Sequence, residues 1–169
     1  MVKKVLLLLL LLWAGLIVFM PKESLYYTLE KRIAKEGIEI NEAQIEEGIF
    51  DLILKHPVIY VHGIKVATLK EIRIRTLLFY NRIKVYDIEV DKSLQHYLPP
   101  KADTVWLTYT VLRPLQIAVK TRGSFGKISG VIRLWEKKIH LDVSNPEKFG
   151  MLRGEMKKGE QGWYYETSF

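Results

Sequence analysis

The chain lacks cysteine and long runs of one charge. No cysteine occurs among its 169 residues, which excludes disulfide bonds, cysteine-ligated zinc and thiol catalysis. Basic and acidic residues are interspersed, and no run of like charge exceeds three residues. Nucleic-acid-binding proteins usually concentrate their basic residues on one stripe. The net charge of +7 is spread along this chain instead, so nucleic acid is not expected as a partner.

Motifs that carry catalysis are also missing from the sequence. It contains no phosphate-binding glycine loop, no G-x-S-x-G elbow, no H-E-x-x-H helix and no dinucleotide-binding fingerprint. The carboxylate pairs Glu46 with Glu47 and Asp87 with Glu89 have no flanking histidine or lysine of the kind an acid–base site needs. We therefore expect no enzyme, no catalytic residue, no cofactor and no metal. The histidines are spread along the chain and are expected in turns or at the surface: His56, His62, His96 and His140.

One long apolar segment is present, from Val5 to Met20, with seven consecutive leucines. A helix of this length, at about 1.5 Å per residue, extends roughly 24 Å, and the hydrocarbon core is about 30 Å thick. Lys3, Lys4 and Lys22 can reach the interfaces with their charged ends. The leucines contribute roughly 2–4 kcal/mol of insertion free energy. Residues 1–20 are therefore expected to be a membrane anchor, with these apolar side chains: Val5, Leu6, Leu7, Leu8, Leu9, Leu10, Leu11, Leu12, Trp13, Leu16, Ile17, Val18, Phe19 and Met20.

A cleaved signal peptide is the competing interpretation of this segment. Cleavage needs small residues at positions −1 and −3. Ala14 is preceded at −3 by Leu12, and Gly15 by Trp13, so we expect an uncleaved signal anchor. Basic residues at the start of the chain predict a cytoplasmic N-terminus under the positive-inside rule. The remaining chain is then expected in the periplasm, anchored to the inner membrane.

Residues 21–36 are expected to form an amphipathic helix beside the membrane. Leu25, Leu29 and Ile33 recur every four residues and form one apolar stripe. Gly37 suits the end of the helix. We expect the stripe to pack on a sheet, and a position on the membrane surface is the alternative.

After Gly37 the apolar period changes to two, which is typical of β-strands. Residues 37–169 are predicted to form a β domain of roughly eight to ten strands joined by short turns, an antiparallel meander. Ile83 and Val85 share one face, whereas Ile88 has the opposite parity. A bulge near Tyr86–Asp87 would restore the register.

Two segments interrupt the period of two. Asp91 can cap a short helix within residues 91–103, which two prolines end. Pro146, just after a capping asparagine, predicts a second helix that stops near Gly159. A last strand follows at residues 163–165. The second helix is expected to turn three side chains inward: Phe149, Leu152 and Met156.

The predicted fold class is mainly β with flanking helices. A transmembrane helix leads into a curved antiparallel β meander, which forms a half-barrel, groove or sandwich and ends in a helix and a last strand. Residues 37–91 and 104–144 have similar amphipathic patterns, and each precedes a capped helix. They are therefore candidates for two distant sub-repeats.

Basic residues near one predicted hairpin form a candidate partner site. If Phe79–Asn81 is the turn, alternate residues of the two paired strands share a solvent-facing side. A plain solvated face is one interpretation, and contact with an acidic partner or lipid headgroups is the other. The residues are Arg73, Arg75, Arg82 and Lys84.

Several strands carry apolar residues on both faces, among them Phe50, Tyr60, Trp106 and Leu112. An open sheet on its own cannot bury both faces. It must curl, form a sandwich or offer one face to an apolar partner.

The layout of the chain resembles a group of bitopic envelope proteins. The apolar segment is followed by Pro21-x-x-x-Leu25-x-x-x-Leu29, then by Gly37-Ile38-x-Ile40 and short apolar strands ending near Gly63. This pattern, over residues 1–90, resembles protein N of the type II secretion system and the opening segment of AsmA-like proteins. Lipopolysaccharide-transport protein C has a similar outline. The resemblance implies an inner-membrane anchor, a periplasmic β domain and no catalysis.

Two functions follow as hypotheses. The first is a non-enzymatic subunit of a bacterial envelope secretion or transport assembly, with other envelope proteins as partners. The alternative is a lipid-binding or lipid-transfer groove, with membrane lipid as the partner, as the AsmA-like resemblance implies. A homo-oligomer is compatible with both.

Overall fold

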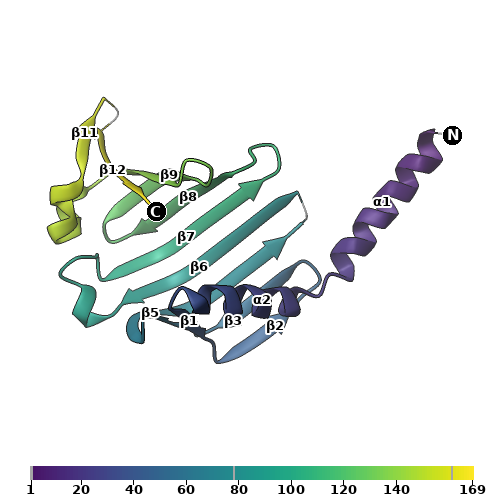
Figure 1. Ribbon diagram of the computed structural model, residues 1–169, viewed down its shortest axis with the longest axis horizontal. Coiled ribbons are helices and arrows are strands. Elements are labelled where there is room, and N and C mark those ends of the chain that lie inside the picture. Colours follow the sequence, from purple (N-terminus) through teal and green to yellow (C-terminus); the bar gives the residue numbers. More distant parts are fainter. Residues whose placement is uncertain (1, 78, 161) are drawn as a thin grey trace.

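The computed structural model describes residues 2–77, 79–160 and 162–169. Helices α1 (Val2–Val18) and α2 (Lys22–Lys35) lead into an antiparallel sheet, which has 12 strands among the described residues. Two short 3₁₀ helices, η1 (Lys92–Leu94) and η2 (Pro146–Glu155), interrupt it. In Figure 1, α1 projects away from the sheet and α2 lies across its first strands. The prediction of a mainly β fold with an N-terminal helix is therefore confirmed, and the sheet is open.

The strands follow the chain order over most of the sheet. Their order is β1-β4-β5-β6-β7-β8-β9-β10-β12-β11, with β2 paired to β3 and β3 to β5. The prediction of eight to ten strands missed short ones such as β2 and β11, because too few residues alternate in them to give a signal. The strands are β1 (Ile38–Asn41), β2 (Gln44–Glu47), β3 (Asp51–Lys55), β4 (Val58–Val61), β5 (Ile64–Thr76), β6 (Tyr80–Val90), β7 (Lys101–Thr110), β8 (Gln116–Gly123), β9 (Gly126–Arg133), β10 (Lys138–Val143), β11 (Lys157–Gly159) and β12 (Gly162–Ser168).

The switch of side-chain parity predicted in the middle of β6 is present at Asp87, which has a φ of 47°. Val85 and Ile88, three residues apart, both pack against the same buried cluster. The pairing with β5 keeps the same register on both sides of Asp87. Lys70 of β5 lies opposite Asp87, and the side-chain parity of β5 changes at that residue too. The ammonium of Lys70 lies 3.5 Å from the Asp87 carboxylate. The feature is thus a paired kink in two strands, whereas an extra residue in one strand was predicted.

Two buried clusters lie on the same face of the sheet. One lies over the first strands and the other over the last strands. In the first, Tyr26 of α2 covers Leu52 and Leu54. In the second, the rings of Phe125 and Phe149 lie 5.3 Å apart over the last strands. One row of cross-strand partners joins the two regions: Leu52, Ile74, Ile83, Leu107, Val119, Gly130, Leu141 and Tyr165. Residues 37–91 and 104–144 belong to this one sheet, and their relation as sub-repeats stays a prediction.

Helix α2 occupies the predicted residues 21–36 closely, but its best-buried contact with the sheet lies outside the predicted stripe, of which Ile33 is half-buried. Tyr26 is only 4% exposed, whereas Leu25 and Leu29 are each about half exposed (52% and 49%). The Tyr26 hydroxyl donates a hydrogen bond of 2.9 Å to the Glu42 carboxylate. A tyrosine can bury its ring while its hydroxyl finds a polar partner, and a search for aliphatic periodicity overlooks this.

Helix α1 contains the expected anchor residues from Val5 to Val18 but ends before Phe19 and Met20. Phe19 is exposed, and Met20 is half-buried at the start of α2. Within the described residues, no single helix combines the length and apolar character of a membrane span. Helices α1 and α2 meet that test only as a pair, with a bend of 59° between them.

The predicted helix after Asn145 is a kinked 3₁₀ segment. Helical geometry breaks at Phe149 and Gly150, where Gly150 has a φ of 47°. Phe149 is buried as expected, and the buried Met156 lies one residue beyond the end of η2. Glycines at two of ten positions weaken a regular helix. The short helix predicted after Asp91 is confirmed as η1. The Asp91 carboxylate caps it by accepting a hydrogen bond from the Ser93 N–H at 3.0 Å.

Candidate functional site

The sheet has two unlike faces, because alternate residues of each strand point to opposite sides. The face under α2 is apolar and carries both buried clusters. The opposite face carries the row Ile53, Arg73, Lys84, Trp106, Lys120, Ser129, Asp142 and Tyr164. We call the first the apolar face and the second the basic face.

The middle of the apolar face is incompletely covered. Helix α2 contacts β1, β2 and β3, which leaves the strands beyond β5 without that helix. Six aliphatic side chains of β7 to β10 are neither in nor packed against the two buried clusters, and all six are half-buried. We call these residues the central strip: Val105, Leu107, Ile117, Val119, Ile132 and Ile139.

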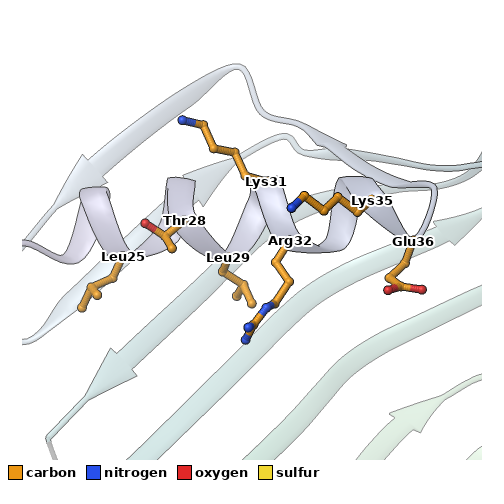
Figure 2. A pocket seen from close by; sticks show the side chains of 7 residues that line it. All are labelled: Leu25, Thr28, Leu29, Lys31, Arg32, Lys35 and Glu36. Carbon is orange, nitrogen blue, oxygen red and sulfur yellow. The ribbon is translucent and has the colours of Figure 1, made fainter.

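Helix α2 forms one wall beside this face. Leu25 and Leu29 line a recess with Leu52, Ile74 and Thr76 of the sheet. Figure 2 shows Leu25, Leu29 and Arg32 pointing from α2 toward the same side. The apolar stripe predicted in α2 is therefore real as a stripe, but it borders an open recess of the sheet.

The four basic residues predicted as a partner patch are brought together on the basic face. Arg73 stands opposite Lys84, and Arg75 stands opposite Arg82, and all four line one recess with Tyr80. The hairpin turn lies earlier than predicted. Tyr80 already begins β6 and Asn81 pairs with Thr76, because β5 and β6 are longer than the alternation suggested. The predicted turn residue Phe79 does lie in the turn.

Carboxylates offset part of this charge. Arg73 donates to Glu71 at 2.9 Å, and Lys55 donates to the other oxygen of Glu71 at 2.9 Å. The hydrogen bond from Lys55, aided by the charge of Arg73, holds the pKa of Glu71 below its ordinary value. Arg75 lies 3.6 Å from Asp51. One half of the patch is therefore paired within the protein.

Arg82 and Lys84 are different: neither has an ion-pair partner among the residues that the structure describes. The Arg82 guanidinium lies 5.1 Å from the ring centre of Tyr80, and its Nε is buried without a hydrogen bond within the described chain. Like charges opposite one another on a sheet are unfavourable. These two residues are the part of the patch whose charge is left for a partner.

The basic face extends further than the sequence interpretation included. Lys120 and Arg122 of β8 line a second recess with Arg82 and Trp106. Lys120 is the cross-strand partner of Trp106, which is itself the partner of Lys84. Lys120 and Arg122 are two residues apart and therefore point to the same side of β8. Nothing in the sequence, however, showed that β8 lies two strands from β6.

The histidines and carboxylates are placed as ordinary surface groups. His56 and His62 have φ values of 48° and 50° beside short connections. His140 lies 3.3 Å from both Asp142 and Glu166 and stacks on Tyr164 at 5.0 Å. Over residues 2–77, 79–160 and 162–169, no group of three or more such side chains is arranged to hold a metal ion.

The fold and these surfaces define a class of protein: an apolar N-terminal helix followed by an open antiparallel sheet with one apolar and one basic face. No family model, curated protein or solved structure matches this chain. The function is therefore argued from the two faces and the helix.

Proposed function

We propose that this protein is a non-catalytic, membrane-anchored lipid-binding module that holds acyl chains on the apolar face of its sheet. The observation that carries the proposal is the central strip, six half-buried aliphatic side chains between two buried clusters. A continuous apolar surface that is only partly covered favours an apolar partner in water. Each acyl methylene that it takes from water gains about 0.8 kcal/mol.

The recess beside α2 suits a lipid with a charged head. Arg32 and Lys35 of α2 line the same recess as Leu25 and Leu29. A lipid whose tail lies on the sheet beside Leu29 can place its phosphate near the Arg32 guanidinium, which binds phosphate in a fixed geometry.

In this proposal, α1 anchors the module in the membrane from which the lipid comes. Its leucines from Leu6 to Leu12 are all more than half exposed, and a helix that is apolar on all sides suits a bilayer. We place α1 in the bacterial inner membrane with the sheet in the periplasm, as the resemblance to AsmA-like proteins implies. The module then receives lipid from the membrane that anchors it.

Site-specific photo-crosslinking tests lipid binding on the apolar face. A photoreactive phenylalanine derivative replaces Leu107 or Val119 in the full chain, and the protein is irradiated in native membranes. Thr108 and Lys120, adjacent positions on the basic face, are the matched controls. We expect phospholipid adducts, identified by mass spectrometry, at 107 and 119 and much less at 108 and 120. Equal yields at all four positions, or none at 107 and 119, would contradict lipid binding by this face.

A second candidate function is an adaptor subunit of an envelope secretion or transport assembly. The charge of Arg82 and Lys84 favours it, since these residues have no internal ion pair among the described residues and an acidic surface would complement them. A crosslinker at Lys84 should capture an acidic envelope protein, and Arg82→Glu should abolish the capture. Recovery of lipid alone, or of the same protein from Arg82→Glu, would contradict this role.

A further inference from the structure

Four turns lie side by side at one end of the strands. We call this end of the strands one edge of the sheet. The hairpins β2–β3, β5–β6, β7–β8 and β9–β10 all turn there. The cross-strand pairs Asp51 with Arg75, Tyr80 with Thr110, and Gln116 with Arg133 place these turns next to one another. Neighbouring turns are also joined by hydrogen bonds. The Val111 N–H donates to the Phe79 carbonyl at 3.0 Å, and the Leu134 N–H donates to the Leu115 carbonyl at 2.8 Å.

The side chains at this edge are large, apolar and exposed. Leu112 is 94% exposed and Trp135 is 83% exposed, which are unusual values for such residues. Each of the four turns contributes at least one exposed residue of this kind. We call the set the apolar rim: Ile49 and Phe50 between β2 and β3, Phe79 between β5 and β6, Leu112 and Leu115 between β7 and β8, and Trp135 between β9 and β10.

The opposite edge of the sheet has a different composition. Its connections carry His62 with Gly63 between β4 and β5, and the polar segment around Ser93 between β6 and β7. Phe125, in the β8–β9 turn, is buried in the second cluster. Exposed apolar or aromatic residues do occur there, namely Ile64, Tyr97 and Met151, but they are scattered. Exposure of apolar side chains is therefore concentrated at one edge.

Helix α1 lies at the same edge as the rim. Phe79 lines one recess with six residues of α1, from Leu6 to Leu16. Figure 1 shows the β5–β6 and β7–β8 turns on the side of the sheet from which α1 projects. A surface that is continuous with an apolar helix has the bilayer as its nearest apolar environment.

Basic residues accompany the rim. Arg113 lies in the same turn as Leu112, and Lys137 lies in the same turn as Trp135; both are exposed. The carboxylate of that second turn, Glu136, is paired with Arg133 at 3.1 Å. Aromatic and basic side chains together are typical of segments at the membrane–water interface. An apolar protein partner explains the exposed Leu112 but gives no role to these flanking charges.

We propose that the apolar rim inserts into the headgroup region of the bilayer that holds α1, so that the sheet stands with this edge on the membrane. Interfacial segments bury their apolar side chains roughly 5–10 Å into the headgroup–acyl boundary. The strands then run away from the membrane surface, and the apolar face opens directly to the lipid layer. The inference rests on the membrane anchoring of α1 in the proposed function, and it adds a second, sheet-borne membrane contact.

The absence of cysteine makes a clean labelling experiment feasible. Single variants Leu112→Cys and Trp135→Cys are made in the full chain, labelled with the fluorophore NBD and reconstituted into phosphatidylethanolamine–phosphatidylglycerol liposomes. Ile64→Cys and Met151→Cys, also well exposed but at the opposite edge, are the matched controls. Leu9→Cys in α1 reports insertion of the helix itself. Quenching by nitroxide-bearing phospholipids is compared with quenching by aqueous iodide.

We expect labels at 112, 135 and 9 to be quenched several-fold more by the lipid nitroxides than labels at 64 and 151. Quenching at 9 with control-like values at 112 and 135 would overturn the rim while leaving the anchor and the lipid-binding proposal intact. Labels at 112 and 135 that are shielded from iodide yet unquenched by lipid would indicate a protein contact and also overturn it. Aqueous behaviour at 9 would remove the anchor itself and the inference with it.

Discussion

Gly130 lies on the apolar face where β10 closely approaches the backbone of β9. A Cβ at this position would overlap the carbonyl oxygen of His140 and would lie 2.8 Å from the Leu141 Cα. A glycine within a strand usually weakens it, unless another group approaches the backbone. The Leu141 side chain occupies that space, with its Cδ2 only 2.9 Å from the Cβ position. The absence of a side chain at Gly130 thereby lets Leu141 pack directly against the backbone of β9.

The substitution Gly130→Ala is expected to destabilise the protein by about 1–3 kcal/mol, the usual cost of overpacking. The free energy of unfolding in denaturant, followed by circular dichroism of the detergent-solubilised full chain, measures this. Gly154→Ala is the control, because nothing lies within 4 Å of its Cβ position. It should change the free energy by no more than about 0.5 kcal/mol. Equal stability of the two variants would show that β9 and β10 are not so close.

Two buried residues of α2, Tyr26 and Lys22, hold the helix to the sheet. Tyr26 is buried in the first cluster, and burial together with the Glu42 carboxylate raises the pKa of its hydroxyl. The hydroxyl therefore stays protonated as the donor of the hydrogen bond to Glu42. Lys22, one turn earlier and also buried, lies 3.7 Å from Glu47. The packed face of α2 therefore ends in two polar contacts with the sheet region, Tyr26 with Glu42 and Lys22 with Glu47.

Tyr26→Ala is expected to cost about 3–5 kcal/mol, as for other large aromatic truncations in cores. Leu29→Ala, on the exposed stripe of the same helix, should cost no more than about 0.5 kcal/mol. Hydrogen exchange of the α2 amides, measured by mass spectrometry, should increase in the first variant alone. A larger effect from Leu29→Ala would mean that the aliphatic stripe, as first predicted, is the packing face.

The junction between β3 and β5 depends on Glu71, which binds Lys55 across the strands. Since the pKa of Glu71 is lowered in the folded chain from its ordinary value of 4.5, the ionised form stabilises the fold. That contribution is fully present above pH 4.5 and is lost as the pH falls through the lowered folded-state pKa.

Glu71→Gln should therefore reduce the free energy of unfolding at pH 7 by roughly 1.5–3 kcal/mol, the range for hydrogen bonds to charged groups. The deficit should shrink toward zero in acid, where wild-type Glu71 is itself protonated. Glu89→Gln, which removes an exposed pair with Lys101, is the control and should have little effect at pH 7. A deficit for Glu71→Gln that persists unchanged at acid pH would contradict the assignment.

At the scale of the whole molecule, apolar surface has two locations with different roles. The central strip lies on a face, between two buried clusters, and suits a ligand that lies along the sheet. The apolar rim lies on an edge beside α1 and suits a planar lipid surface. In the proposed function, the two together bring an acyl-chain site next to the membrane that holds α1.

The basic face completes this arrangement. Arg75 and Arg82 are close to the end of their hairpin, near Phe79 of the rim. A sheet that stands on its rim thus presents basic residues toward anionic headgroups, and Lys120 and Arg122 lie further across the face. The same surface serves an acidic partner in the adaptor role, and the crosslinking experiment at Lys84 distinguishes a protein partner from lipid.

The sequence by itself determined the local elements of this protein. Apolar leucines define α1, the change of period at Gly37 marks the start of the strands, and the opposite parities of Val85 and Ile88 locate the kink at Asp87. The charged cross-strand cluster around Arg82 was also predicted, since it needs only one hairpin. All of these signals depend on residues near one another in the chain, where backbone periodicity alone fixes which side chains share a face.

The tertiary structure decided the rest. It selected Tyr26 over Leu25 and Leu29 as the packing contact of α2, and it placed Lys120 beside Trp106. It also gathered Leu112, Trp135 and the other turn residues at the edge that carries α1. These outcomes depend on strand order and on the docking of one helix, which are set by long-range packing free energy and leave no periodic trace in the sequence.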